Sequence, residues 1–240
     1  MNARDRLQAA RAAVKEGRYE EALRGYVWFH ENALAEDIAL RGVRLSFALG
    51  NWRDLGDLYP PALVKLQETA DVKRMLLEQG AEDCSLFNDV VAIDRELKNE
   101  RATYDLFVAI HEKSPEFAQR CAQEATPVMI KFADFARARS FIHDPQTIVL
   151  QLAKEFDECI ERVLGNWLRG RRQAMLDAYL QNYVEDIGML VTIFAGTGDR
   201  QLADELALMA SKELRNLDMK KKVAKKLMRS RETLRQTSPT

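Results

Sequence analysis

The chain has 240 residues, of which 47% are hydrophobic and 30% are charged, a composition typical of a globular domain with an apolar core. Its 36 Lys and Arg residues nearly balance its 37 Asp and Glu residues, so the net charge does not favour nucleic acid or a membrane surface as a partner. Glycine and proline are few and alternating β-type runs are nearly absent, which predicts an all-α protein.

The sequence shows no segment of the signal-peptide or membrane-spanning type. The most apolar stretch, residues 187–196, is shorter than the roughly twenty residues that span a bilayer. The cysteines Cys84, Cys121 and Cys159 are widely spaced and form no CxxC pattern. We interpret them as buried free thiols in a reducing cytoplasm, with a zinc or redox site as the alternative.

Helix signals separated by short breaks run through the N-terminal half. Glycine suits a left-handed helix C-cap, which predicts helix ends at Gly17 and Gly50. Proline can open a helix, and Asp or Ser can cap one, so further helices are expected to begin at Pro61, Asp71 and Ser85. The other predicted helices of this half are residues 3–16, 19–34, 37–49, 52–59 and 100–113.

The C-terminal half continues the pattern with longer helices. Ser114-Pro115 predicts the next helix start, and Pro127 predicts a kink or a split within that helix. A break is expected at Gly170 and a turn at residues 196–198. The remaining predicted helices are residues 134–142, 145 to about 168, 171–194, 199–217 and the following segment to about 235. Connections this short make consecutive helices antiparallel neighbours.

A short motif recurs along the chain: a small residue, a polar residue, an aromatic residue, two variable positions and a small residue. It begins at Gly17, and again with substitutions at Gly50, Ala133 and Gly198. The first interval is close to a period of about 34 residues, and the last is close to twice that period. Such a period is typical of stacked helix pairs.

This motif resembles the turn and second helix of a tetratricopeptide repeat (TPR). The turn, aromatic and small positions correspond to Gly17, Tyr19 and Ala22 in the first unit, and to Gly50 and Trp52 in the second, where Leu replaces the small residue. The resemblance implies an all-α, right-handed, TPR-like superhelix of antiparallel helix pairs in one domain, 1–240. Its regular units are expected at about 3–70 and 85–143, irregular long helices at about 145–195, and a final helix pair at 199–235.

In the resembled family, the first helix of each pair lines a concave groove. Mapped onto this chain, the groove residues are Arg4, Gln8, Arg11 and Lys15 in the first unit and Asp37, Arg41, Arg44 and Phe47 in the second. Most of them are basic, which favours another protein with an acidic surface or peptide as the partner, whereas a merely solvated helix face is the alternative. Trp28 is a candidate contact anchor, with packing against the following helix as its alternative.

A second charged region lies at the C-terminus. Its candidate basic face consists of Lys221, Lys222, Lys225, Lys226 and Arg229. RNA, an anionic lipid or an acidic protein could bind there, and a solvated terminal helix is the alternative. No aromatic residues are interleaved with these cations, so base stacking has no support, and Val223, Leu227 and Leu234 are spaced to face the core.

No catalytic, metal or cofactor site is predicted. His30, His111 and His143 lie far apart in the sequence and form no zinc-protease pattern. Asp89 and Asp94 lie on an otherwise apolar helix, where polar contacts between helices are expected. The sequence therefore favours a non-enzymatic protein-binding scaffold. A nucleic-acid-associated helical-repeat protein is the second hypothesis, and an enzyme the third.

Overall fold

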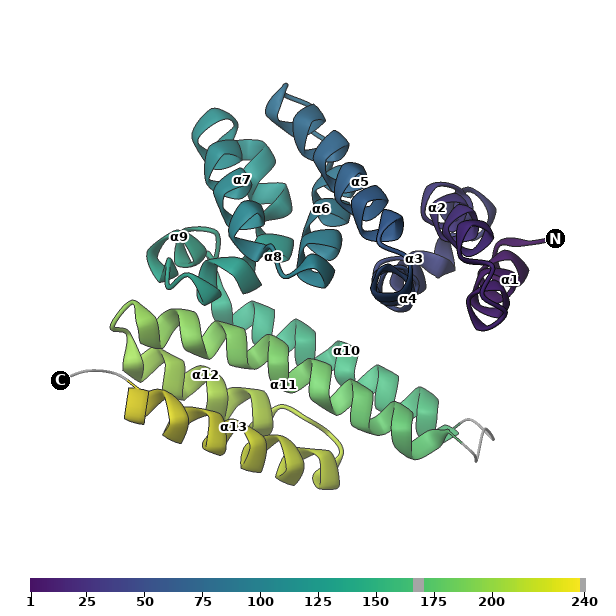
Figure 1. Cartoon of the computed structure of the whole chain (residues 1–240). Coiled ribbons are helices and arrows are strands. Elements are labelled where there is room, and N and C mark those ends of the chain that lie inside the picture. The colour runs from purple at the N-terminus through teal and green to yellow at the C-terminus, as the bar shows by residue number, and fades with distance from the viewer. Residues whose placement is uncertain (166–170, 238–240) are drawn as a thin grey trace. The chain divides into compact units, whose positions relative to one another are not determined.

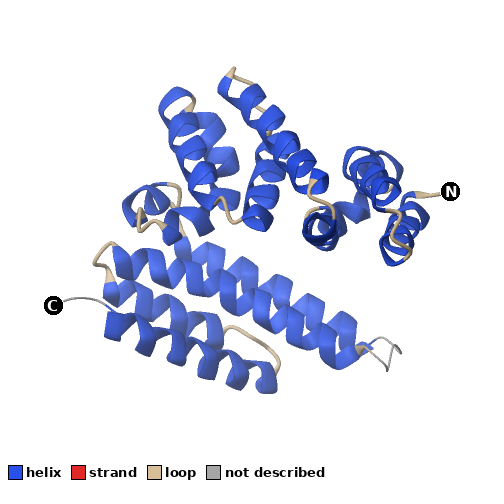
Figure 2. Ribbon diagram, viewed as in Figure 1, coloured by secondary structure: helices blue, strands red, loops and turns tan. Residues whose placement is uncertain are grey.

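The computed structural model describes residues 1–165 and 171–237, with side chains described as far as residue 228. Within these ranges all regular structure is helical, without a strand, as Figure 2 shows. In the same part of the chain, no helix has both the length and the apolar character needed to cross a bilayer. Contacts divide the chain into two compact units, Met1–Val128 and Met129–Thr240, whereas the sequence predicts one continuous repeat domain.

Unit 1 is a succession of short and medium helices (Figure 1). They are α1 (Ala3–Lys15), α2 (Tyr19–Glu36), the 3-10 helix η1 (Ile38–Leu40), α3 (Arg41–Arg44), α4 (Phe47–Leu58), α5 (Pro61–Glu78), α6 (Cys84–Leu97), α7 (Glu100–Lys113) and α8 (Pro115–Lys131), whose last turn lies beyond the unit boundary. The predicted helices at 3–16, 19–34 and 100–113 are confirmed within two residues at each end. The helix that starts at Pro115 continues through Pro127, so of the kink or split predicted there, the split is wrong.

The prediction for residues 37–59 is wrong in its boundaries. The Asp37 carboxylate accepts a hydrogen bond from the Ala39 amide at 2.9 Å and opens η1 instead of an α-helix. Ser46, with φ −132° and ψ −93°, then interrupts the helical backbone before α4 begins. Gly50 lies inside α4, so the turn of the second helix pair lies between α4 and α5. A glycine can sit within a helix when its neighbours bury enough surface, and Trp52 of the same helix is only 1% exposed.

Two predicted helix starts also differ from the structure. Asp71 lies inside α5, which is continuous from Pro61 to Glu78. The cap of α6 is Asp83, whose carboxylate accepts hydrogen bonds from both the amide and the hydroxyl of Ser85 at 2.7 Å. Asp and Ser are both good N-cap residues, so the sequence alone does not choose between adjacent candidates.

Helices of unit 1 pack against their neighbours in sequence and against helices further along the chain. Consecutive packing joins α1 to α2, α4 to α5, α5 to α6 and α6 to α7, and longer-range packing joins α1 to α4, α2 to α4, α4 to α6 and α5 to α7. Gly25 lets α1 and α2 approach closely, because a Cβ there would lie 2.7 Å from the Cβ of Ala10. Phe29, Trp52 and Leu66 are among the large buried side chains of this core.

Unit 2 is built mainly from long helices that lie alongside one another (Figure 1). They are α9 (Phe135–Ser140), α10 (Pro145–Gly165), α11 (Arg172–Gly196), α12 (Arg200–Lys212) and α13 (Leu217–Thr237). Here α11 packs against α9, α10, α12 and α13, and α12 also packs against α10 and α13. The apolar core includes Phe156, Ile187 and Leu206. The break predicted at Gly170 lies outside the described residues.

Three of the four recurrent motifs do begin at turns between helices. Gly17, Ala133 and Gly198 have φ values of 74°, 55° and 87°, in the left-handed region. Two of them are glycines, which adopt this conformation without the steric cost of a Cβ. The motif at Gly50 is the exception, since it lies within α4.

Candidate functional site

A cluster of ionisable side chains lies in the interior of unit 1, where α2, α3, α5 and α6 contribute one residue each. Asp89 is 4% exposed, and its two carboxylate oxygens accept hydrogen bonds from Arg44 at 2.5 and 2.7 Å. Lys73 Nζ lies 2.8 Å from the same carboxylate, and His30 Nε2 lies 3.6 Å from it. Arg44 Nε also donates to the carbonyl oxygen of His30. One buried carboxylate therefore faces three basic side chains.

The protonation states in this cluster follow from burial and pairing. Burial on its own would raise the pKa of Asp89, but hydrogen bonds from Arg44, His30 and Lys73 hold that pKa far below its ordinary value. Burial lowers the pKa of His30, although the nearby Asp89 opposes this shift. A neutral His30 beside a paired carboxylate indicates a structural cross-link between helices.

A second buried carboxylate lies one and a half turns further along α6. Asp94 is 0% exposed, and its two oxygens accept hydrogen bonds from Arg74 at 2.9 and 3.0 Å. Thr103 of α7 donates to it at 2.7 Å. Burial raises the pKa of Asp94, against the lowering effects of Thr103 and Arg74. The expected polar contacts of Asp89 and Asp94 between helices are thereby confirmed.

Arg44 is the one predicted groove residue that the structure removes from the surface. Its side chain is buried, and its guanidinium group is committed to Asp89 and His30. A partner cannot reach it in this conformation, so its assignment to a partner-binding surface is wrong. The physical reason is a carboxylate 45 positions later in the chain, which no local pattern around Arg44 reveals.

Four predicted residues share one face of α1, which we call the α1 stripe: Arg4, Gln8, Arg11 and Lys15. Arg4, Gln8 and Lys15 are exposed, whereas Arg11 is half-buried. Arg4 forms an ion pair with the predicted groove residue Asp37 at 3.2 Å. The stripe is therefore less positive than the sequence alone suggests, because one of its cations has an acidic partner.

The segment that joins η1 to α4 presents three large side chains to solvent. Phe47 is 73% exposed and Ile38 is 65% exposed. Arg41 is also exposed, and no ion pair to it is found in the described part of the chain. We call Ile38, Arg41 and Phe47 the exposed triad. The Arg4–Asp37 ion pair and the packing of α1 on α4 place the α1 stripe beside this segment.

Trp28 lies away from the α1 stripe. The Arg6 guanidinium carbon lies 4.0 Å from the centre of its ring, a cation–π arrangement with the preceding helix. A surface hollow of about 290 Å³ adjoins the pair and is also lined by Ala9 and Ala10. These α1 residues lie on the side opposite Arg4, because successive helical residues rotate by about 100°. Trp28 thus packs against the preceding helix, α1. The alternative given from the sequence was packing against the following helix.

Two of the predicted C-terminal cations have partners within unit 2. Lys222 Nζ lies 2.7 Å from an Asp218 oxygen, one turn earlier on α13. Lys226 Nζ donates to the Gln181 side chain of α11 at 2.9 Å. The ion pair with Asp218 reduces the positive charge that α13 offers to an outside partner, whereas the neutral Gln181 side chain leaves the charge of Lys226 in place.

The remaining predictions for the C-terminal helix concern its exposed cations and its core-facing side. Lys221 and Lys225 are exposed on α13, in line with a basic face. Val223 is 0% and Leu227 is 3% exposed, so the predicted core-facing side of this helix is confirmed for both. The Arg229 and Leu234 side chains lie outside the described residues.

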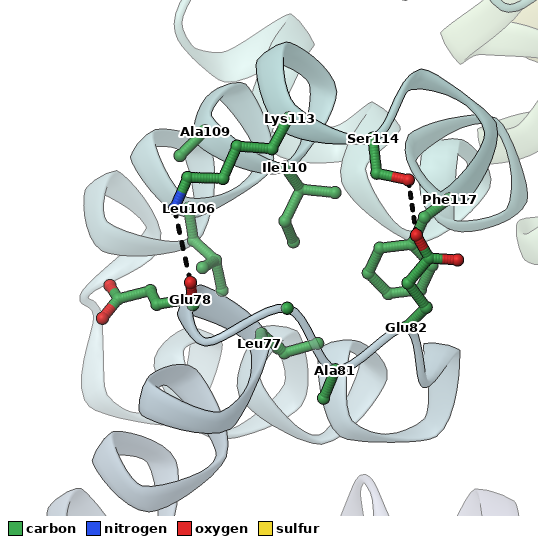
Figure 3. Close-up of a pocket in the computed structure, with 11 residues that line it drawn as sticks. Leu77, Glu78, Ala81, Glu82, Leu106, Ala109, Ile110, Lys113, Ser114 and Phe117 are labelled. Atoms are coloured by element: carbon green, nitrogen blue, oxygen red, sulfur yellow. Dashed lines mark hydrogen bonds between the residues drawn. The ribbon is translucent and has the colours of Figure 1, made fainter.

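Sequence reasoning missed a small apolar pocket in unit 1, shown in Figure 3. Its volume is about 50 Å³, far below the roughly 300 Å³ and more of small-molecule sites. It is lined by Leu77, Glu78, Gly80, Ala81, Glu82, Leu106, Ala109, Ile110, Lys113, Ser114 and Phe117. Such a pocket has room for the end of one apolar side chain. Only tertiary packing brings the 80–82 turn against α7 and α8, so no sequence motif marks it.

Two hydrogen bonds close the rim of this pocket (Figure 3). Lys113 Nζ donates to the Glu78 carbonyl oxygen at 3.3 Å, and Ser114 Oγ donates to a Glu82 carboxylate oxygen at 2.6 Å. Both contacts are exposed to solvent. The rim is thus held by contacts that can exchange with water.

Among the described side chains, no group of three or more His, Cys, Asp or Glu residues lies close enough together to hold a metal ion. Comparison of the chain with protein-family models, with curated proteins and with solved structures finds no match. The function proposed below therefore rests on the residues and contacts of this chain.

Proposed function

We propose that the chain is a non-enzymatic scaffold that binds a partner protein through the exposed triad and the neighbouring α1 stripe. In this proposal unit 1 is a TPR-like, right-handed superhelix in which α1, α4 and α6 are the first helices of successive pairs. The packing of α1 on α4 and of α4 on α6, with α5 on α7, supports this arrangement. Three free cysteines fit a reducing compartment such as the cytoplasm.

The single observation that carries the proposal is the exposure of Phe47. A phenylalanine that leaves 73% of its surface in water forgoes the stabilisation of burial, and no core contact explains its position at the start of α4. Aromatic and arginine side chains dominate the energetics of protein interfaces. Phe47 and Arg41 lie six residues apart and are both exposed, and both belong to the groove set that the resemblance to a tetratricopeptide repeat implies.

The chemistry of this surface defines the class of partner. Arg41, Lys15 and Arg11 provide cations that carboxylates can pair with, and Ile38 and Phe47 provide apolar area. The matching ligand is a peptide segment with Asp or Glu residues beside a large apolar side chain.

Selection from a displayed library of random peptides tests this function. The full chain should enrich peptides that combine acidic and large apolar residues. Phe47→Ser and Arg41→Glu should each weaken binding of an enriched peptide by about thirtyfold, as expected when an interface anchor worth about 2 kcal/mol is lost. Fluorescence anisotropy with the labelled peptide measures the change.

Leu208→Ser is the matched control, because Leu208 is 65% exposed on α12 of unit 2. This variant should bind the selected peptide like the wild type. The proposal is refuted if the library yields no enriched sequence, or if Phe47→Ser and Arg41→Glu bind as tightly as Leu208→Ser.

The alternative function is nucleic-acid association through α13. Its support is the exposure of Lys221 and Lys225 on adjacent turns of a basic helix. It predicts salt-sensitive binding of labelled RNA or DNA that Lys221→Glu with Lys225→Glu abolishes. Anisotropy that stays flat at low salt for both nucleic acids would exclude this function.

A further inference from the structure

Two of the three cysteines lie in contact although 37 positions separate them in the chain. Cys84 is the first residue of α6, and Cys121 lies in α8. Their sulfur atoms are 3.1 Å apart, and both thiols are free. A disulfide bond measures about 2.05 Å, so a sulfur displacement of about 1 Å would bring the pair to bonding distance.

We propose that Cys84 and Cys121 are a redox modification site, which hydrogen peroxide converts into a reversible disulfide between α6 and α8. Cys84 is partly exposed, whereas Cys121 is 0% exposed. Peroxide therefore reaches the sulfur of Cys84 first. Cys121 is the resolving thiol, because it already lies against that sulfur.

The surroundings of the pair fit these two roles. The thiol of Cys121 donates a hydrogen bond to the sulfur of Cys84, so the two sulfur atoms are already in contact. Cys84 is also the first residue of α6, where the helix N-terminus carries a partial positive charge. Burial, and then the contact with Cys84, raises the pKa of Cys121, so the inner thiol keeps its proton until it reacts.

The reaction balances with hydrogen peroxide as the only co-reactant. The Cys84 sulfur attacks one peroxide oxygen and its thiol loses its proton. The O–O bond breaks as an S–O bond forms to give a sulfenic acid, and the departing hydroxide takes that proton to become water. The Cys121 sulfur then attacks the Cys84 sulfur and loses its proton. The S–S bond forms as the S–O bond breaks, and the departing hydroxide takes that proton as the second water.

The disulfide would reinforce contacts that already join the same two elements. Ser114 and Arg120 of the α8 region donate to the Glu82 carboxylate at 2.6 and 3.0 Å, and both contacts are exposed. Phe117, one turn before Cys121, lines the apolar pocket opposite the 80–82 turn (Figure 3). In the reduced protein, exposed polar contacts hold the two walls of this pocket together. Oxidation would add a covalent bond between the same walls.

Thiol counting and peptide mapping test the inference on the full chain. The reduced protein is transferred to reductant-free buffer and treated with hydrogen peroxide. Thiols that react in denaturant should fall from three to one, and a non-reducing peptide map should show Cys84 joined to Cys121. Hydrogen exchange of the amides of the 80–82 turn should slow by about tenfold and recover with dithiothreitol.

Two variants distinguish the pair from general oxidation. Cys84→Ser should form no internal cross-link, whereas Cys159→Ser, with its substitution in unit 2, should form it as the wild type does. Circular dichroism confirms that each variant is folded, and Cys121→Ala provides a second variant without the pair. The inference is overturned if peroxide takes Cys84 to a sulfinic acid without a cross-link, if the cross-link includes Cys159, or if exchange at the turn is unchanged.

Discussion

The two units differ in how their interiors are held together. Among the described side chains, the buried polar groups of unit 1 are His30, Arg44, Asp89, Asp94 and Thr103, and those of unit 2 are Asp157 and Ser211. In unit 1 the two buried carboxylates are each paired with a cation from another helix. In unit 2 long helices pack along an apolar core, and the one buried acid contacts the Arg215 amide and a mostly exposed guanidinium group.

The difference indicates that buried charge pairs specify the position of a helix more strictly than apolar contacts do. Apolar contacts are non-directional, so short helices such as α3 can slide or rotate without a large loss of burial. The hydrogen bonds of Asp89 to Arg44 fix one arrangement, because any shift leaves a buried charge unpaired. Long helices such as α10 and α11 repeat their apolar contacts over many turns and depend less on such pairs.

The largest expected effect is the loss of the Asp89 carboxylate. Asp89→Asn leaves Arg44 and Lys73 without their buried acid, so the free energy of unfolding of unit 1 should fall by about 3–5 kcal/mol. Urea denaturation followed by circular dichroism measures the change. Asp157→Asn is the comparison in unit 2 and should cost about 1 kcal/mol, since the Arg215 side chain is 60% exposed. Equal losses in the two variants would refute the contrast between the units.

A smaller effect is expected from pH, and it should be specific to unit 1. The pKa of His30 is lowered in the folded chain, so between about pH 6.5 and that lowered pKa the unfolded chain binds more protons. Stability should therefore fall as the pH drops below about 6.5, with a slope of at most about 1.4 kcal/mol per pH unit. The depressed pKa of Asp89 adds a further loss below about pH 4, where the unfolded carboxylate is protonated first.

His30→Gln isolates the histidine contribution. This variant should lose the decrease between pH 6.5 and 5 and keep the loss at lower pH. His143→Gln, at an exposed position of unit 2, should show the same dependence of stability on pH as the wild type. Urea denaturation at several pH values measures all three proteins, and identical profiles for His30→Gln and the wild type would contradict the assignment.

The smallest effect is expected in unit 2, from the loss of one buried hydrogen bond. Tyr183 donates a buried hydrogen bond to the carbonyl oxygen of Ala210 at 2.7 Å, which joins α11 to α12. Tyr183→Phe should lower the stability of unit 2 by about 1 kcal/mol, because the acceptor loses its donor. Thermal unfolding by circular dichroism measures the change, with Tyr179→Phe, at a half-buried position of the same helix, as control. A loss as large as that of Asp89→Asn would mean that unit 2 also depends on single polar contacts.

Local signals predicted those elements whose ends carry a strong cap or breaker. Gly17 ends the first helix, Pro61 and Pro115 each open a helix, and Gly198 forms a turn, as the sequence indicates. The failures lie where tertiary contacts override a local signal. Gly50 lies inside α4 while Trp52 is buried beside it, and Asp71 lies on a continuous α5.

The candidate site was predicted only in part, for a related reason. The resemblance to a tetratricopeptide repeat implied that Arg41 and Phe47 line an accessible groove, and both are exposed. The same resemblance included Arg44, which is buried against Asp89. The pocket at the 80–82 turn and the contact of Cys84 with Cys121 had no signal in the sequence, since each joins residues tens of positions apart.

Local sequence signals were enough to predict that the protein is helical, where most of its helices begin and end, and that Asp89 and Asp94 form contacts between helices. These properties follow from backbone propensity, capping and the helical period, which act over a few residues. The burial of Arg44, the exposure of Phe47 and the contact between two distant thiols follow from the tertiary packing alone. Those outcomes depend on which helices pack together, and burial and charge pairing set that choice over the whole unit.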